Sequence, residues 1–212
     1  MSATRLVHRD LDSFFRVPLE QYGPADAYVS PLRGDLAKTL DGRTNPVFGS
    51  PDQITYMTFE RAGRPVGRIT AHIHARSNER HGLRRGSFGY FDCANDPEAA
   101  CALLDAASEW LARRGCDEIV GNFNLTAMQE MGVVVDRHDL APFTAQHHNP
   151  RWIPELLTAN GFEPFFPMTT WSVDLGRVGP DALLGPRQRA LLEDADLVLT
   201  PIGRWRFRAT ME

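Results

Sequence analysis

The stretch at residues 86–124 constrains the fold of this 212-residue chain more than any other. An aromatic-rich run at 87–93 predicts a strand. Asp96 and Pro97 then supply an N-cap and a first helical residue, apolar residues recur at helical spacing, and a glycine supplies the left-handed stop. Residues 117–123 follow as a buried strand. Two parallel strands joined by a crossover helix are the simplest arrangement of such a unit.

The flanking segments predict a mixed α/β domain. Two strands at 54–61 and 65–75 pair around a turn at Ala62–Gly63, and the second alternates apolar and polar side chains. The other expected elements are a strand at 6–8, a helix at 10–22 interrupted by Pro18, a short helix near 32–40, a polar loop at 76–85, a helix at 150–160, one or two strands at 162–175, a helix at 187–194 and a strand-like run at 197–202. Composition changes near Gly176, which predicts a domain at 1–175 and a C-terminal appendage at 176–212.

Composition and charge narrow the class of protein. The chain is 42% hydrophobic and 24% charged, as in ordinary soluble globular proteins, and its net charge of −4 favours neither nucleic acid nor an anionic membrane as a partner. The sequence contains no apolar run of transmembrane length and no signal-peptide pattern at its start. Three widely spaced cysteines without a CxxC motif indicate reduced thiols. We therefore expect a cytoplasmic protein.

Residues 67–174 contain sequence motifs that are similar to those of a bacterial branch of the GCN5-related N-acetyltransferase (GNAT) superfamily. The shared motifs are GRI at 67–69, NERHG at 78–82, SFGYFDCANDPEAA at 87–100, LLDAASEWLARRG at 103–115 and GFEPF at 161–165. The resemblance implies an α/β, GNAT-like fold, in which a mixed central sheet is flanked by helices. It also implies transfer of an acyl group from acyl-CoA to an amine. Residues 199–212 resemble the start of a second unit of this kind.

The segment that usually binds the CoA pyrophosphate in this superfamily is altered. The family pattern is Gln/Arg-x-x-Gly-x-Gly/Ala, whose glycines let backbone N–H groups approach phosphate at a helix N-terminus. Here residues 92–97 read DCANDP, with two carboxylates and no glycine, and Pro97 removes one N–H donor. The simpler interpretation is a well-capped helix start. No cofactor-binding residue is assigned, and the thioester donor is expected to be an unusual acyl-CoA or an acyl-carrier protein.

The most unusual local feature is a histidine pair on the strand at 65–75. His72 and His74 are two residues apart and would project from one face, and Glu79 and His81 follow in the next segment. Two imidazoles and a carboxylate can hold a divalent transition metal, so His72, His74 and Glu79 are candidate ligands. Alternatively, one of the four residues acts as the general base for an attacking amine. A half-exposed polar strand face is the plainest interpretation.

Other candidates for substrate contacts lie in the second half. Asn122 and Asn124 end the second core strand, where an acetyltransferase sheet splays, and they either bind a substrate carbonyl or form a turn. His148 precedes the helix at 150–160, in a loop where Asn149 is the expected N-cap. Trp152 either lines an acyl pocket or belongs to the core.

Two classes of function follow from these features. The first is acyl transfer from a thioester, either acyl-CoA or an acyl-carrier protein, to an amine of a small molecule by direct attack. The second is a repurposed fold, with either a histidine-based metal site running other small-molecule chemistry or a non-catalytic binding role. A shared fold is a weak warrant for shared chemistry, so both remain open at this point.

Overall fold

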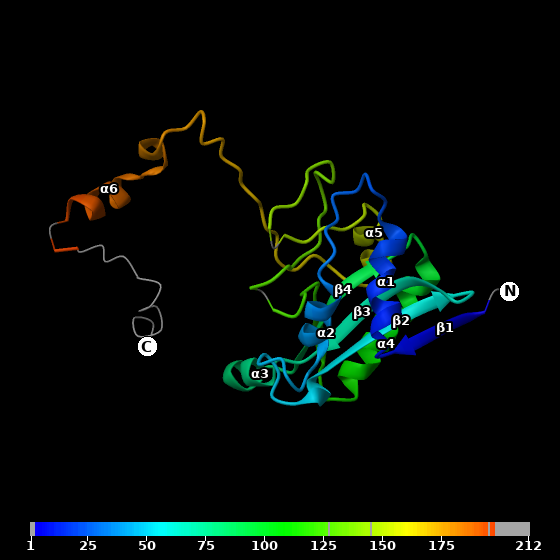
Figure 1. Cartoon of the computed structure of the whole chain (residues 1–212). Coiled ribbons are helices and arrows are strands. Elements are labelled where there is room, and N and C mark those ends of the chain that lie inside the picture. Colours follow the sequence, from blue (N-terminus) through cyan, green and yellow to red (C-terminus); the bar gives the residue numbers. More distant parts are fainter. Residues whose placement is uncertain (1–2, 127, 145, 195, 198–212) are drawn as a thin grey trace. The chain divides into compact units, whose positions relative to one another are not determined.

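The computed structural model describes residues 3–126, 128–144, 146–194 and 196–197. The chain divides into two compact units, Met1–Glu163 and Pro164–Glu212. The first unit holds a five-stranded sheet in the order β1-β2-β3-β4-β5 (Figure 1). Its strands are β1 Thr4–His8, β2 Ile54–Arg61, β3 Arg64–His72, β4 Arg85–Cys93 and β5 Glu118–Val120.

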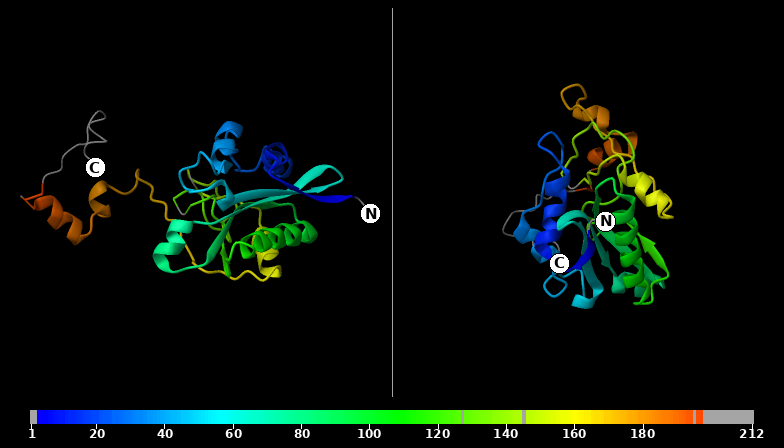
Figure 2. Two further views of the ribbon diagram at one scale, coloured as in Figure 1. Left: turned by 90° about the horizontal axis from the view of Figure 1, so that it is seen from below. Right: turned by 90° about the vertical axis from the view of Figure 1, so that its right-hand side faces the viewer.

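The first four strands pair antiparallel and β4 pairs parallel with β5. Helix α4, Pro97–Ala112, connects the parallel pair, and helix α1, Leu11–Gln21, lies on the opposite face of the sheet (Figures 1 and 2). The predicted α/β fold with a mixed sheet flanked by helices is confirmed. The strand–helix–strand core is the arrangement that the sequence predicted.

The two large helices begin where local signals place them. Asp10 caps α1 by accepting from the backbone N–H of Asp12, and Asp96 caps α4 by accepting from that of Ala99. Pro18 was expected to interrupt the first helix, but α1 continues through it. A proline inside a helix leaves the carbonyl four residues earlier without its donor. In α1 that carbonyl belongs to Phe14, and the Arg68 side chain donates to it at 3.4 Å.

The second core strand is shorter than predicted. Beyond Val120 the chain leaves the sheet edge and crosses the α1 side of β4, where the backbone N–H of Phe123 donates to Phe88. A Cβ atom at Gly89 would lie 1.6 Å from the Phe123 carbonyl oxygen, so only glycine fits beneath the crossing segment. The register between β3 and β4 also shifts at this level, and Tyr90 has a φ of 48°.

Several other boundaries differ from the sequence-based expectations. The predicted polar loop at 76–85 contains helix α3, Ala75–His81, which Gly82 ends in a left-handed conformation. The predicted helix at 150–160 is shorter: α5 spans Ile153–Ala159. Asn149 is not its N-cap, because the Asn149 side chain bonds both backbone groups of Val134 instead.

The remaining elements complete the comparison with the sequence. Helix α2, Arg33–Leu40, and helix α6, Pro186–Glu193, lie where helices were expected, and short 3-10 helices occupy Pro51–Gln53 and Pro180–Leu183. The structure assigns no strand to residues 162–175, all of which are described. Most of the run at 197–202 and the segment at 199–212 lie outside the described residues. The predicted boundary at 175 stays a prediction. No helix in the described part of the chain has the length and apolar character needed to cross a membrane.

Candidate active site on the α1 face of the sheet

The α1 face of the sheet carries a row of buried polar side chains. Arg68, Thr70 and His72 alternate along β3 with Ile69 and Ala71, which join the apolar cluster on the α4 side. The three polar residues are at most 3% exposed. Burying polar side chains costs free energy unless partners satisfy them. Stability alone therefore does not explain why this part of the core is polar.

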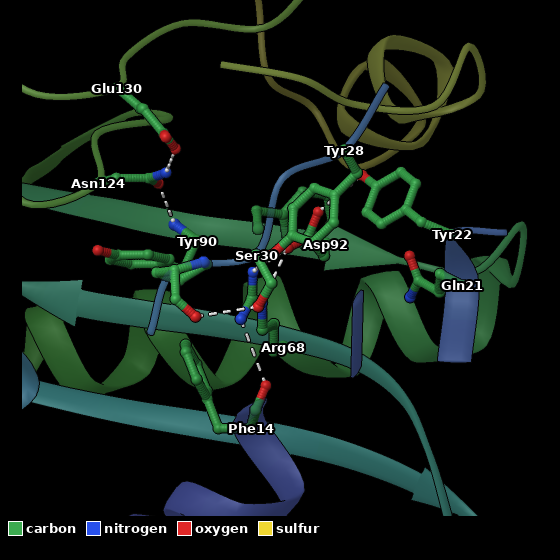
Figure 3. A network of polar contacts seen from close by, with 12 residues as sticks. Phe14, Gln21, Tyr22, Tyr28, Ser30, Arg68, Tyr90, Asp92, Asn124 and Glu130 are labelled. Carbon is green, nitrogen blue, oxygen red and sulfur yellow. Dashed lines mark hydrogen bonds and ion pairs between the residues drawn. The ribbon is translucent and has the colours of Figure 1, made fainter. Parts of the chain in front are cut away.

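At one end of the row, Arg68 forms a buried ion pair with Asp92. The Arg68 Nε atom donates to Asp92 Oδ2 at 2.8 Å, and Tyr22 donates its hydroxyl to Asp92 Oδ1 at 3.0 Å (Figure 3). The guanidinium also lies over the rings of Phe14 and Tyr90, at 5.0 and 5.6 Å from their centroids. Burial and the nearby Asp92 charge raise the pKa of Tyr22, so its hydroxyl remains a donor.

Asn122 and Asn124 fasten the crossing segment to β4. The Asn124 Oδ1 atom accepts from the backbone N–H of Tyr90 at 2.7 Å, and the Asn122 Oδ1 atom accepts from that of Phe91 at 3.3 Å. The Asn124 amide nitrogen donates to Glu130 at 2.8 Å, and the Asn122 amide nitrogen lies 3.2 Å from the Nε2 atom of His147. Both asparagines are nearly fully buried. Their amides are thus committed to protein partners, and the strand edge that they cover offers no free N–H at these two positions.

Glu130 and His147 are the titratable groups that these asparagines hold. Burial raises the pKa of the half-buried Glu130 carboxyl, against the Asn124 hydrogen bond, which lowers it. Burial lowers the pKa of His147 to about 4, so this imidazole is neutral near pH 7 and can accept from the Asn122 amide. Glu130 is therefore a carboxyl at the edge of the network whose pKa burial shifts upward.

His72 and His74 lie side by side at the other end of the row, with ring centroids 5.2 Å apart. The pairing that the sequence predicted is present, although β3 ends at His72 and His74 precedes α3. Within the described residues, no protein group has hydrogen-bonding geometry to either ring nitrogen of His72. Burial, and secondarily His74, lower the pKa of His72 to about 3. His72 is consequently a neutral, buried ring.

His74 has a defined tautomer. Its Nε2 atom lies 2.7 Å from the carbonyl oxygen of Leu125, which can only accept, so Nε2 carries the proton and Nδ1 keeps a lone pair. Burial lowers the pKa of His74 below its ordinary value, against that hydrogen bond, which raises it. The imidazole is therefore neutral near pH 7. It can accept a proton at Nδ1.

His74 also lines a cavity of about 330 Å³. Its walls come from the loop before β2, the start of α3 and the segment after Leu125. The lining residues are Pro46, Val47, Gly49, Gln53, His74, Ala75, Arg76, Ser77 and Thr126. A cavity of this size beside a neutral imidazole can hold part of a small molecule. One of the predicted base candidates therefore lines a cavity of this size.

The other two predicted residues of this motif lie apart from the cavity lining. Glu79 and His81 are exposed on α3. Among the residues that the structure describes, no group of three or more His, Cys, Asp or Glu side chains could hold a metal ion. His72, His74 and Glu79 therefore do not form the metal centre that their spacing suggested, because the chain turns into a helix after His74.

The N-terminus of α4 has the character that its sequence predicted. The side chain and carbonyl of Asp96 take the backbone N–H groups of Ala99 and Ala100. The Asp96 and Glu98 carboxylates bind the Arg61 guanidinium at 2.7 and 3.0 Å. This turn places two carboxylates beside Arg61 and uses the N–H groups of Ala99 and Ala100 internally, so it lacks the cradle that a pyrophosphate needs.

Two further predicted substrate contacts have protein partners. The Trp152 Nε1 atom donates to the carbonyl of Cys93 at 2.8 Å, and its ring packs on the apolar cluster of the α4 face. His148 lies beside Tyr22, with 5.5 Å between ring centroids, and burial lowers its pKa. Trp152 therefore anchors α5 to the end of β4. His148 lies at the edge of the Arg68–Asp92 network.

Sequence analysis missed the centre of this network. Arg68 and Asp92 each stand inside a predicted strand, where a charged residue is unusual unless it is paired. That pattern was a usable signal. Tyr22, Tyr28 and Glu130 gave no comparable signal, because helix ends and loops carry such residues freely and only the folded chain brings them to the sheet (Figure 3).

Comparisons with known proteins give relatives in sequence but no family model that matches. Protein YghO of Escherichia coli (strain K12) is 28% identical over 213 residues, which cover 99% of this chain and 53% of that protein. The bacterial ceramide synthase of Caulobacter vibrioides (strain NA1000 / CB15N) is 29% identical over 154 residues, which cover 72% of this chain and 40% of that enzyme. The chain thus spans about half the length of the curated relatives it matches.

Solved structures with a similar arrangement are more distant. An aminoglycoside acetyltransferase from an uncultured soil metagenomic sample, in complex with sisomicin, has a TM-score of 0.47 and 9% identity, covering 81% of this chain and 97% of that chain. A ribosomal-protein-alanine N-acetyltransferase from Brucella melitensis has a TM-score of 0.41 and 12% identity, covering 81% and 99%. In sequence, the chain is a homologue of protein YghO and of a bacterial ceramide synthase.

Proposed function

We propose that this chain is an N-acyltransferase domain, which moves an acyl group from a thioester to the amine of a small molecule. The ceramide synthase relative supports this reaction, because a ceramide is the amide of a long-chain amino alcohol with a fatty acid. The first acceptor to test is therefore a long-chain amino alcohol. The donor is a long-chain acyl thioester, carried either by CoA or by an acyl-carrier protein.

The observation that carries the proposal is the neutral His74 imidazole in the wall of the 330 Å³ cavity. In the proposed reaction the amine nitrogen attacks the thioester carbonyl and the carbon–sulfur bond breaks. The Nδ1 atom of His74 takes the proton that the amine loses, and the resulting imidazolium gives this proton to the leaving thiolate. The bond from Nε2 to the Leu125 carbonyl keeps the ring oriented and stabilises the imidazolium that forms.

The remaining candidates receive other roles in this proposal. Glu130 is the alternative base, since its carboxyl is half-buried and its pKa is raised. Asn122 and Asn124 hold the crossing segment in place, and Trp152 holds α5. His148 is retained as a substrate contact because it lies beside Tyr22 and is only partly buried. His72 supports the His74 ring by direct contact.

The test is amide formation, followed by mass spectrometry, from a long-chain acyl-CoA or the same acyl group on a carrier protein, with a long-chain amino alcohol as acceptor. His74→Gln should lower kcat by about 10²–10⁴-fold, the usual contribution of a general base. The exposed His81→Gln is the matched control and should leave kcat unchanged. Wild-type turnover by His74→Gln, together with a large loss in Glu130→Gln, would move the base to Glu130. Unchanged thioester in every donor–acceptor pair would refute acyl transfer.

A further inference from the structure

Helix α3 presents arginines beside the cavity of the candidate site. Arg76 lines the cavity, and Arg80 lies one helical turn later on the same face. Both side chains are exposed, and neither has an ion pair among the described residues. Figure 1 shows α3 at the end of the sheet where β3 finishes and β4 begins.

A third guanidinium extends this surface. Arg114 donates to the backbone carbonyl of Asp52, next to Gln53, which lines the same cavity as Arg76. It too has no carboxylate partner in the part of the chain that the structure describes, whereas the nearby Arg84 is paired with Asp117. Arg76, Arg80 and Arg114 outnumber Glu79, the carboxylate of α3, so this end of the sheet has a local basic surface on a chain whose net charge is −4.

The opposite end of β4 is acidic. There Asp96 and Glu98 surround the start of α4, and the turn uses its backbone donors internally. A donor that relies on a pyrophosphate at that turn would meet carboxylates. A thioester carried on a phosphopantetheine arm of an acidic protein needs no pyrophosphate site, and its carrier would instead be attracted to exposed guanidiniums.

We propose that α3, through Arg76 and Arg80 with Arg114 alongside, is the docking surface for an acidic acyl-carrier protein, which delivers its thioester into the cavity at His74. This inference rests on the proposed acyl transfer and names its donor. The carrier's acidic residues pair with the guanidiniums, and the arm enters next to Arg76. The acyl group thereby reaches the base without passing the N-terminus of α4.

The experiment compares two donors that bear the same acyl group, a carrier protein and CoA, with the full chain. Arg80→Glu, which leaves the cavity lining intact, should raise KM for the acyl-carrier protein at least tenfold and leave kcat/KM for acyl-CoA within twofold. Adding Arg76→Glu to this variant should raise KM for the acyl-carrier protein further. Arg151→Glu, which reverses an exposed arginine elsewhere, is the matched control and should change neither donor. Circular dichroism and thermal melting confirm that each variant is folded.

Direct binding of holo-carrier protein, measured by isothermal titration calorimetry at low and high salt, separates this inference from the proposed function. Binding that weakens with salt and is lost in the Arg76/Arg80 variant, without amide formation from any donor, would support docking and refute acyl transfer. Amide formation from acyl-CoA, with no binding or use of the carrier, would support acyl transfer and refute docking. Equal effects of Arg80→Glu on both donors would overturn the docking surface.

Discussion

The two faces of the sheet differ in what they bury. The α4 face is covered by an apolar cluster in which side chains such as Ile69, Phe88 and Leu103 are almost fully enclosed. The α1 face buries Arg68, Asp92 and polar groups of β3 at similar depth. Apolar burial stabilises without directional requirements, whereas buried polar groups cost stability unless each is satisfied. The α1 face also has an apolar cluster that includes Phe14, Leu36 and Ile54, so both faces stabilise the fold, and the α1 face adds the buried polar row beside the proposed site.

The largest expected effect comes from breaking the buried ion pair. Arg68→Ala leaves the Asp92 carboxylate buried without its cation and should lower the free energy of unfolding by about 3–5 kcal/mol. Arg84→Ala, which removes the exposed pair with Asp117, should cost at most about 1 kcal/mol. Urea denaturation of both variants measures the difference. Equal losses would mean that the α1 face is stabilised no differently from the surface.

Lowering the pH should reduce the free energy of unfolding, because the folded chain buries neutral histidines. The pKa values of His72 and His147 are lowered in the folded state to about 3 and about 4, so the unfolded chain binds protons first as the pH falls below the ordinary imidazole value. Stability is therefore full near pH 7 and falls with pH down to those folded values, by up to about 1.4 kcal/mol per pH unit for each group. The raised pKa of Glu130 opposes this trend.

The histidine contribution can be measured by urea denaturation at pH 7 and pH 5. His72→Gln should lose about 1–2 kcal/mol less between these pH values than the wild type does. His8→Gln, at an exposed position of β1, is the matched surface control. An unchanged slope in His72→Gln would show that this ring is not the group that titrates.

A methyl group at Gly89 tests the crossing segment. Gly89→Ala places its Cβ against the Phe123 carbonyl, a backbone atom that cannot rotate away, so the cost should lie near the top of the ~1–3 kcal/mol seen for overpacking. Gly34→Ala, in α2 with open space around its Cβ, should be neutral or stabilising by up to about 1 kcal/mol. Thermal unfolding of both variants makes the comparison. A neutral Gly89→Ala would place the segment elsewhere.

The smallest effect belongs to the contact that anchors α5. Trp152→Phe keeps the aromatic packing but removes the bond to the Cys93 carbonyl, and should cost about 0.5–1.5 kcal/mol. Acyl transfer by this variant should match the wild type. If turnover falls tenfold or more while stability is retained, Trp152 contacts substrate and the α4 side contributes to the site after all.

Local sequence signals predicted the main helices and strands well and the irregular segments poorly. The caps at Asp10 and Asp96 and the alternation around Ile69 each depend on a few neighbouring residues, so they survive in the folded chain. Helix α3 was missed because its seven residues are polar on every side, and Gly82 was its main sequence signal. The strands expected at 162–175 are absent because strand formation requires a partner edge, which sequence pattern cannot supply.

By itself the sequence determined the strand–helix–strand core, the acidic start of α4 and the adjacency of His72 and His74, since each depends on residues that are close along the chain. The tertiary structure decided which polar groups meet. Arg68 pairs with Asp92 through the register of β3 and β4, and Asn124 reaches Tyr90 only because the chain crosses β4 after Val120. These contacts join residues 24 and 34 positions apart, so the shift in register and the crossing at Gly89 fix them.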